Sequence, residues 1–505
     1  MQKYIRLLNT IKYLKVKQIY FRLFYFLRAK YRKLMRFEYI FLKVSNVTPL
    51  TLCESIENKY SNFTGTTLSV LNLSKNFKDK IDWNYAEHGK LWTYNLTYFE
   101  YLKEKEDIWL IYDFIENIQQ LRDALEPFPI SLRGINWIKF VTKYQIKNKT
   151  IDDSLYAQYY ILLDNLEYHL LGNHLLENGF SLLFGAYYFQ DEKLYATAKE
   201  ILQQELQEQI LEDGGHFELS PMYHQLMLFR LLDCINLVQN NSWKKRELLE
   251  FFTLKAQMML SWLQNITYKD GTIPLLNDSA NKIAPTSKEL FKYAYKLGIT
   301  FQATPLNDSG YRKTVQGSYE AIVDIAEIGA SYIPGHAHAD TFNFELRIDS
   351  KPFIVDSGLS TYEVNKIRFY ERSTKAHNTV EVLEKNSSEV WGGFRVANRA
   401  KVVSLQEKED IIKATHDGYK GILHTRIWQF FENKVIIKDT LSKKTQAIFR
   451  LHFHPDIVKD EIQKRVEAKN CTITTYSFAS EFNKTQQALV LEIPFTQELE
   501  VEIKL

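Results

Sequence analysis

The feature that most constrains the fold is a change of hydrophobic period near residues 307–317. Before this point, apolar residues recur at i, i+3, i+4 and i+7, the spacing of helices that bury one face. After it, short runs rich in Val, Ile, Phe and Thr are broken by Gly, Asn, Asp and Lys, the pattern of antiparallel strands. The change predicts a helical domain followed by a β-sandwich.

The individual elements follow from the same spacing. Helices are predicted at residues 156–172, 174–190, 193–211, 219–240, 246–267 and 287–298. Strands are predicted at residues 318–326, 341–349, 378–384, 399–405, 422–431, 434–440, 446–454, 470–477 and 486–493. Short breaks between the helices imply antiparallel helical pairs, as in a bundle or an α/α toroid. A chain of 505 residues exceeds one hydrophobic core, so several domains are expected.

Composition and charge limit the functional classes. A formal charge of +3 is too small to argue for nucleic acid as the partner. Three widely spaced cysteines exclude a disulfide framework and a Cys-rich metal site. The apolar run near residues 19–27 is interrupted by Arg22, so no signal peptide is expected, and no stretch is apolar enough to span a membrane. These features predict a protein of the cytoplasm or of the inner membrane face.

The N-terminal residues 11–43 mix Lys and Arg with Tyr, Phe and Leu at helical spacing. One interpretation is a helix packed on the main body of the protein. The other is an amphipathic helix that makes peripheral contact with an anionic membrane. Spacing and composition leave both open.

The strongest local signal is the pair His336 and His338 with Asp340, just before a predicted strand. Asp356 and His377 follow in β-type surroundings. A His/Asp/His set suits zinc, which accepts imidazole nitrogen and carboxylate oxygen in tetrahedral geometry. The alternative is a set of hydrogen-bonded histidines in a polar layer of the sandwich.

Two polar clusters lie at predicted helix starts. Asn173 is a candidate N-cap, and His174 and Glu177 after it share a helix face. The second cluster has Ser220 as candidate cap with Tyr223 and His224 in the first turn of the helix. Polar aromatic and imidazole groups at helix starts can face a cleft. Capping and surface exposure explain each cluster equally well.

A third group is rich in aromatic and amide side chains. Trp and Tyr faces stack on sugars, and an Arg guanidinium can hold a carboxylate through two hydrogen bonds. The candidates are Tyr98, Arg133, Asn136 and Trp137. The same residue types also serve in protein cores.

Together these segments resemble the heparinase II/III-like polysaccharide lyases, which include related alginate lyases. The resemblance runs from about Trp92 to the end of the chain. It is carried by four ordered motifs: Asn173-His174-x-x-Glu177, Glu218-x-Ser220-Pro221-x-Tyr223-His224, Gly335-His336-x-His338-x-Asp340 and Arg372-Ser373-Thr374-x-x-His377-Asn378-Thr379. It implies an α/α toroid followed by an antiparallel β-sandwich. The expected divisions are a basic, aromatic helical extension at 1–75, the catalytic toroid at 76–305 and the sandwich at 306–505.

The resemblance also implies roles for the matched residues. Asn173 would neutralise a uronate carboxylate, and Tyr223 would be the general acid and, for one stereochemistry, also the base. His336 would be the catalytic histidine of the sandwich, and His174 a second histidine found in some members. The expected substrate-binding residues are Tyr98, Arg133, Asn136, Trp137, Glu177, His224 and Tyr362, with Tyr370 as the alternative to Tyr362.

The metal residues carry over in the same way. His338, Asp356 and His377 match the ligands of one structural Zn²⁺ per chain, behind the cleft.

The implied reaction is β-elimination on a polysaccharide that contains uronic acid. A base removes the C5 proton, an acid protonates the leaving oxygen at C4, and hydrogen bonds stabilise the enediolate. A tyrosine base needs a pKa lowered by cationic neighbours, for which His174, His336 and Arg133 are candidates. The N-terminal extension favours a capsule or surface-polysaccharide pathway. The alternative is a non-lytic protein of the same fold that binds or assembles glycan.

Overall fold

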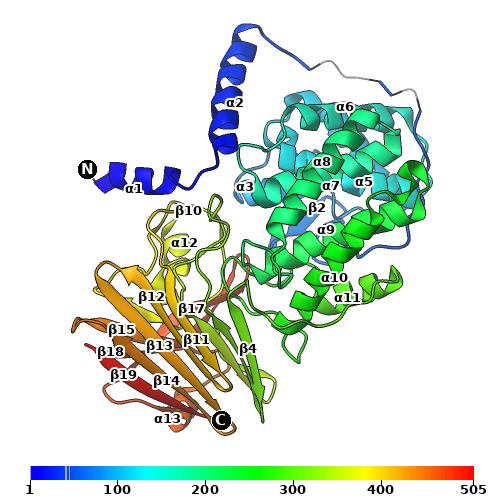
Figure 1. Ribbon diagram of the computed structural model, residues 1–505. Helices are drawn as coiled ribbons and strands as arrows, with labels where there is room; N and C mark the ends of the chain where they lie inside the picture. The colour runs from blue at the N-terminus through cyan, green and yellow to red at the C-terminus, as the bar shows by residue number, and fades with distance from the viewer. Residues whose placement is uncertain (1, 40–42, 45) are drawn as a thin grey trace.

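The helical domain precedes the three large sheets along the chain, in the predicted order (Figure 1). The computed structural model describes residues 2–39, 43–44 and 46–505. Residues 40–42, at the end of the predicted stretch 11–43, lie outside the described residues, and α2 (Val16–Leu34) occupies most of that stretch. A second N-terminal helix, α1 (Gln2–Ile11), precedes it. None of the described helices combines the length and apolar character needed to cross a bilayer.

The helical domain follows a small antiparallel sheet. That sheet contains β1 (Asn62–Thr64), β2 (Thr67–Val70) and β3 (Leu73–Asn76). The helices are α3 (Lys90–Tyr98), α4 (Ile108–Asn117), α5 (Pro127–Lys143), α6 (Lys149–Asp164), α7 (Gly172–Phe189), α8 (Glu192–Gln209), α9 (Pro221–Asn240), α10 (Leu249–Ile266) and α11 (Ser287–Lys296). Five of the six predicted helices match α7 to α11 closely. The prediction 156–172 is wrong at both ends, because α6 begins at Lys149 and ends at Asp164.

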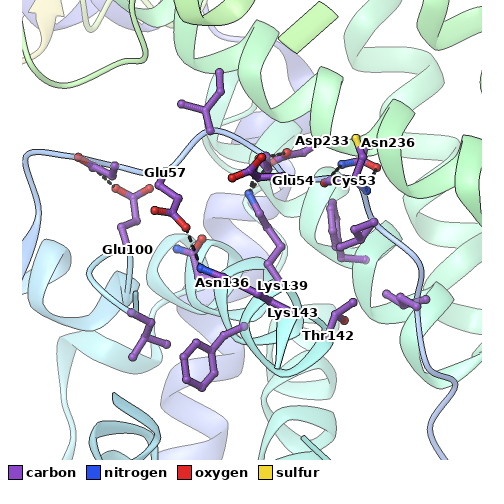
Figure 2. A pocket seen from close by; sticks show the side chains of 18 of the residues that line it. Cys53, Glu54, Glu57, Glu100, Asn136, Lys139, Thr142, Lys143, Asp233 and Asn236 are labelled. Carbon is purple, nitrogen blue, oxygen red and sulfur yellow. Dashed lines mark hydrogen bonds and ion pairs between the residues drawn. The ribbon is translucent and has the colours of Figure 1, made fainter. Parts of the chain in front are cut away.

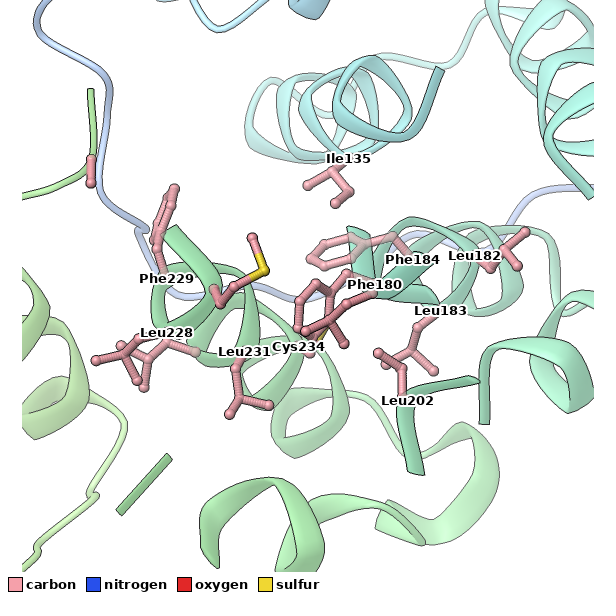
Figure 3. Packing of buried hydrophobic residues seen from close by; sticks show 14 of the residues in the cluster. Ile135, Phe180, Leu182, Leu183, Phe184, Leu202, Leu228, Phe229, Leu231 and Cys234 are labelled. Carbon is pink, nitrogen blue, oxygen red and sulfur yellow. The ribbon is translucent and has the colours of Figure 1, made fainter. Parts of the chain in front are cut away.

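The core of the helical domain forms around α7, which is buried on almost every side. A helix that is apolar all round must be enclosed by its neighbours. Figure 3 shows Phe180, Leu183 and Phe184 of this helix among apolar side chains of α5, α8 and α9. Gly185 permits a close approach, since a Cβ there would lie 2.7 Å from the Tyr159 ring.

Three antiparallel sheets build the C-terminal domain. The first is β4 (Tyr311–Gln316), β5 (Tyr319–Asp324), β6 (Phe344–Ile348) and β7 (Lys351–Ile354). The second, in spatial order, is β11 (Val402–Lys408), β12 (Ile411–Tyr419), β13 (Ile422–Phe431), β14 (Lys434–Leu441), β19 (Glu498–Lys504) and β16 (Val466–Glu467). The third is β17 (Thr472–Glu481), β18 (Lys484–Phe495), β15 (Ala447–His452) and β8 (Val380–Val382).

Shorter elements complete this domain. They are β9 (Val390–Trp391), β10 (Arg395–Val396), α12 (Lys366–Glu371) and α13 (Lys459–Arg465). Alternating burial along β13 and β14 places Trp428, Phe430 and Ile437 in a second apolar core. The predicted order of a helical toroid followed by an antiparallel β-sandwich is confirmed.

The two domains join through the loop that follows α10. There Tyr268 donates a hydrogen bond to Glu345 of β6 at 3.0 Å, and Arg347 pairs with Asp270. Further along the loop, the Asn277 amide accepts from the backbone N–H of His338 at 2.9 Å. The loop therefore links the start of α9 to the segment that carries the predicted histidines.

Candidate active site

The candidate site lies where the N-terminus of α9 meets the loop before β6. Ser220 caps α9 by accepting from the backbone N–H of Tyr223, with Pro221 at the first helical position. This places the Tyr223 ring on the His336 ring, with centroids 3.8 Å apart and planes 28° apart. The Tyr223 hydroxyl lies 3.2 Å from that of Tyr362. Residues distant in sequence thus form one aromatic cluster at the domain joint.

Asp278 holds both His336 of this cluster and the neighbouring His338, although no sequence motif points to it. Its buried carboxylate lies 2.9 Å from His336 Nδ1 and 2.8 Å from His338 Nε2. Arg368 of α12 contacts both carboxylate oxygens, at 2.5 and 2.7 Å. These contacts hold the pKa of Asp278 well below its usual range against the opposing effect of burial. The carboxylate is therefore a fixed negative charge between the two histidines.

Asn173 belongs to the same site but already has a partner. At the start of α7, its amide nitrogen lies 3.0 and 2.8 Å from the two carboxylate oxygens of Glu218. Glu218 Oε2 is also 3.6 Å from His336 Nε2. The donor expected to bind a uronate carboxylate is thus held by a protein carboxylate. To bind a substrate carboxylate, the Asn173 amide must give up its hydrogen bonds to Glu218 and donate to the substrate instead.

The electrostatic surroundings of Tyr223 differ from the expectation. Burial raises the pKa of the Tyr223 phenol, and the Asp278 and Glu218 carboxylates add to this, while the Tyr362 hydroxyl opposes it. A lowered pKa from cationic neighbours was expected, and that expectation is wrong for this arrangement. The phenol therefore keeps its proton at neutral pH.

His174 lies beside this cluster and is half-buried. Burial disfavours its charged form, but the Glu167 carboxylate, 2.9 Å from His174 Nδ1, outweighs burial and raises the pKa of His174. Its ring packs against Phe128 at a centroid distance of 4.9 Å. The Glu167 contact therefore favours the charged form of His174 more than in a free imidazole.

A cavity of about 110 Å³ opens beside the aromatic cluster. Among the residues that line it are Tyr98, Glu177, Tyr223, Arg230 and Tyr362. The Oε2 atom of Glu177 has no hydrogen-bond partner among the described residues. Burial raises the pKa of Glu177 to about 7, although the Arg230 guanidinium opposes this. Three predicted substrate-binding residues thus line this cavity together with the predicted catalytic tyrosine.

Three other predicted substrate-binding residues are not brought to the site. Arg133 is fully buried and donates to Gln158 and to backbone carbonyls within the helical domain, so it cannot clamp a substrate carboxylate. Trp137 is fully buried against Phe99 and Phe114. His224 is buried against Trp262. These predictions are wrong, because core packing uses the same residue types as sugar recognition.

A larger cavity of about 660 Å³ lies under residues 50–58, and Asn136 lines it (Figure 2). Figure 2 shows that two of its lysines already have acidic partners. Lys139 lies 2.8 Å from Asp233, and Lys143 lies 2.9 Å from Glu57. The lining holds four basic and four acidic side chains, so the cavity offers no excess positive charge to a polyanion.

The predicted metal residues lie behind the cluster, buried in the sandwich. His338 Nδ1 and His377 Nε2 have no hydrogen-bond partner in the described structure, and the two rings are 5.3 Å apart. Asp356 Oδ2 accepts from His377 Nδ1 at 2.8 Å and from Asn343 at 2.6 Å. Within the described residues, no three His, Cys, Asp or Glu side chains are arranged to hold a metal ion. The two unpartnered nitrogens still fit a bound cation, since leaving them bare costs free energy.

Two protein-family models and several known proteins are similar to this chain. The model described as "Heparinase II/III N-terminus" matches residues 139–298, and "Heparinase II/III-like, C-terminal" matches residues 299–497. A "Heparin-sulfate lyase" of Bacteroides stercoris is 23% identical over 315 residues, 57% of this chain and 46% of the relative. A protein of the same description from Pedobacter heparinus is 24% identical over 337 residues, 60% of this chain and 49% of the relative. The chain spans about half the length of the curated relatives it matches.

Solved structures agree on the fold. The "Crystal Structure of Heparinase III" aligns with a TM-score of 0.63 and 17% identity, covering 85% of this chain and 80% of that chain. Heparan sulfate lyase HepC from Pedobacter heparinus aligns with a TM-score of 0.53 and 16% identity, covering 85% and 79%. The two matched models together span residues 139–497, across both domains. The chain belongs to the heparinase II/III-like family.

Proposed function

We propose that the protein is a polysaccharide lyase that cleaves a uronic-acid-containing glycan by β-elimination. The observation that carries the proposal is the stack of Tyr223 on His336, with Tyr362 and Asn173 beside it, at the joint of the two domains. An acid, a base candidate and an amide donor in one place are the groups that the reaction needs. Relatives described as heparin-sulfate lyases support the same class of reaction.

The surroundings of Tyr223 and His336 favour different roles for the two residues in the reaction. Tyr223 keeps its proton because its pKa is raised, which suits an acid that protonates the leaving oxygen at C4. Asp278 occupies His336 Nδ1, so Nε2, which lies 3.6 Å from Glu218 Oε2, is the nitrogen left to accept the C5 proton. As that proton leaves, the C4–oxygen bond breaks, a C4=C5 double bond forms, and the tyrosine proton moves to the departing oxygen. Products therefore carry a 4,5-unsaturated end.

The uronate carboxylate of the substrate must be bound by a separate set of residues. In the proposal, Asn173 releases Glu218 and donates to the uronate carboxylate, while His174 supplies positive charge nearby. Hydrogen bonds to this carboxylate stabilise the enediolate that forms when the C5 proton is removed. Glu177, Tyr98 and Tyr362 are the proposed contacts to flanking sugars, because they line the adjoining cavity.

We also propose one structural zinc ion per chain. His338 Nδ1 and His377 Nε2 would bind it, with Asp356 exchanging its contact to His377 for the metal. The ion would cross-link buried segments of the sandwich. Asp278 holds His338 Nε2, so it fixes the tautomer that leaves Nδ1 free for the metal.

The proposed biological setting is capsule or surface-polysaccharide metabolism, in the cytoplasm or at the inner membrane face. Support comes from the cationic, aromatic N-terminal region, where eleven Lys or Arg and no Asp or Glu occur in residues 1–37. The substrate class is an acidic polysaccharide or oligosaccharide.

A screen of purified protein against uronic-acid polysaccharides tests the proposal through ultraviolet absorbance of unsaturated ends. We expect product with at least one such glycan, and at least a 100-fold lower rate for Tyr223→Phe. The matched control is Tyr195→Phe, which removes a partly buried hydroxyl on α8 that donates to Glu247 and does not line the cavity beside Tyr223. A fully active Tyr223→Phe enzyme would contradict the assignment, and glycan binding without product would favour the non-lytic alternative.

A further inference from the structure

Helix α2 packs on the protein through its polar face. Gln18 donates to the carbonyl of Leu170 at 2.9 Å, and Tyr25 donates to that of Leu166 at 2.5 Å. Arg28 and Arg32 both contact Asp164. These residues recur at helical spacing and define the side of α2 that faces the body. The anchoring contacts are thus hydrogen bonds and ion pairs rather than apolar packing, with the stack of Phe21 on Tyr168 as an aromatic addition.

The opposite side of α2 is apolar and exposed. Leu23 and Leu27 are 59% and 54% exposed, and Val16 and Leu34 at the two ends are 82% and 80% exposed. The same side also carries Ile19, Tyr20, Phe26 and Tyr31, each between 47% and 63% exposed. A surface helix normally buries its apolar stripe against the core. Here the orientation is reversed, so the stripe is available to something outside the chain.

Helix α1 repeats this arrangement on the other domain. Arg6 pairs with Glu389, and Thr10 accepts a hydrogen bond from the Trp391 indole at 3.1 Å. On its other side, Tyr4 and Leu8 are 73% and 67% exposed. Figure 1 shows both helices on the outside of the molecule, away from the packed helices of the toroid. We call the outward sides of α1 and α2, with the residues named above, the N-terminal apolar face.

Positive charge surrounds the N-terminal apolar face. Within the described residues, none of the ion pairs involves Lys17, Arg22, Lys30, Lys33 or Arg36. Lys30 lies on the exposed side of α2, and Arg22 and Lys33 flank it. An apolar stripe bordered by lysine and arginine, without acids, is the composition of helices that lie in the interface of an anionic bilayer.

We propose that the N-terminal apolar face docks on an anionic lipid surface. Apolar side chains would enter the boundary between headgroups and acyl chains, and the flanking cations would bind the headgroups. A second copy of the chain is a poorer occupant, because its face would bring the same uncompensated positive charge against this one. The inference stands on the N-terminal helices alone and does not depend on the lyase activity.

The docking would also hold the candidate site near the membrane. Gln18 and Tyr25 anchor α2 to the segment 164–171, which leads directly into Asn173 and His174. Gln18 also reaches the carbonyl of Tyr332, four residues before His336. A membrane-bound α2 would thus contact both the segment that leads to Asn173 and the segment that leads to His336. A glycan held at the membrane by a lipid would then lie within reach.

Vesicle flotation of the full-length protein tests the docking. The vesicles are pure phosphatidylcholine, or phosphatidylcholine with about one third phosphatidylglycerol. We expect the wild type to float with the anionic vesicles and to be released by high salt. Leu23→Glu/Leu27→Glu should lower the bound-to-free ratio at least about tenfold. The matched control, Leu254→Glu/Val458→Glu, adds the same charge at side chains that are 55% and 61% exposed elsewhere, and should float like the wild type.

Three outcomes would overturn the proposal. The first is absence of flotation with anionic vesicles, and the second is equal flotation of the Leu23→Glu/Leu27→Glu variant and the wild type. The third is a doubled mass in solution that this variant abolishes, which would assign the face to a second copy. Circular dichroism of both double variants confirms that each is folded before flotation.

Discussion

Asp278 contacts two histidines whose other ring nitrogens face different surroundings. His336 Nε2 lies 3.6 Å from Glu218 Oε2, whereas His338 Nδ1 has no hydrogen-bond partner among the described residues. Which nitrogen of an imidazole carries the proton is set by the partner of the other nitrogen. One carboxylate therefore sets the tautomers of a proposed catalytic residue and a proposed metal ligand. We regard Asp278 as a positioning residue.

Asp278→Asn should lower kcat at least about 100-fold and change KM much less. An amide keeps the shape but cannot accept from both histidines and Arg368, so the tautomer of His336 is no longer fixed. Steady-state kinetics across pH measure the effect, and the pH profile of kcat should change shape.

The control for this change is Asp439→Asn. Asp439 is equally buried and pairs with Arg426 and His424, at 2.8 and 2.6 Å, within strands β13 and β14 of the sandwich. Both variants should lose stability on the order of 3 kcal/mol, because each leaves a buried arginine without its charge partner. Equal kcat values for the two variants would show that Asp278 acts only through stability.

Glu177 predicts a pH dependence of folding. Its pKa rises from the ordinary 4.5 to about 7 in the folded protein, so between these values the folded state binds the proton more tightly than the unfolded chain. Ionisation of Glu177 therefore costs stability as pH rises through this window. Relative to the wild type, Glu177→Gln should gain at most about 3 kcal/mol of unfolding free energy between pH 4.5 and pH 7.5. Urea unfolding at several pH values measures it, and a difference that is flat with pH would contradict the assignment.

At the scale of elements, Ser220 joins two parts of the site. It caps α9 beneath Tyr223 and donates to the carbonyl of Asp278 at 2.7 Å. Ser220→Ala should cost about 1–2 kcal/mol and also lower kcat, because both Tyr223 and Asp278 lose a support. Thr286→Ala removes a comparable cap at α11, where Thr286 accepts from Glu289 N, and should cost about 1 kcal/mol with unchanged kcat. Chemical denaturation and initial rates separate the two effects.

Most elements were predictable because the apolar side chains that a helix or strand buries recur in the sequence with the period of that element. Helices α7 to α11 follow from the 3.6-residue spacing, and β13 and β14 from alternation. The prediction at α6 continued too far because Leu166, Leu170 and Leu171 keep helical spacing after the helix has ended. Leu171 has a φ of +63°, so the chain turns sharply there to start α7. Apolar spacing alone cannot distinguish a buried turn from a helix.

The site was predictable only where motifs were local. Asn173 and Tyr223 each lie in the first turn of a helix, and Glu218 and the Tyr223 ring connect them to His336 in the loop before β6. Asp278 was missed because a single acid in a loop, 58 residues before His336, has no spacing that ties it to a histidine. Arg133 was misjudged because most of its partners are backbone carbonyls, which no side-chain pattern records.

At the scale of the whole molecule, the proposed metal residues come from three separate segments. His338 precedes β6, Asp356 follows β7, and His377 precedes β8. An ion held by all three would close long loops of the sandwich, and its binding free energy would add to the stability of the folded chain. Because Asp278 contacts both His338 and His336, loss of the ion would also disturb the position of His336 in the candidate site.

We therefore expect purified protein to contain about one zinc per chain, measured by elemental analysis. Chelation should lower the stability by about 3–4 kcal/mol and the Tm by about 10 °C, with activity declining as the sandwich loosens. His338→Ala should lack zinc and show no further shift with chelator. His416→Ala, which removes another fully buried histidine of the same domain, should lose stability but keep its zinc. Metal-free wild type of unchanged Tm would refute the structural ion, and immediate loss of activity at unchanged Tm would instead indicate a metal that takes part in catalysis.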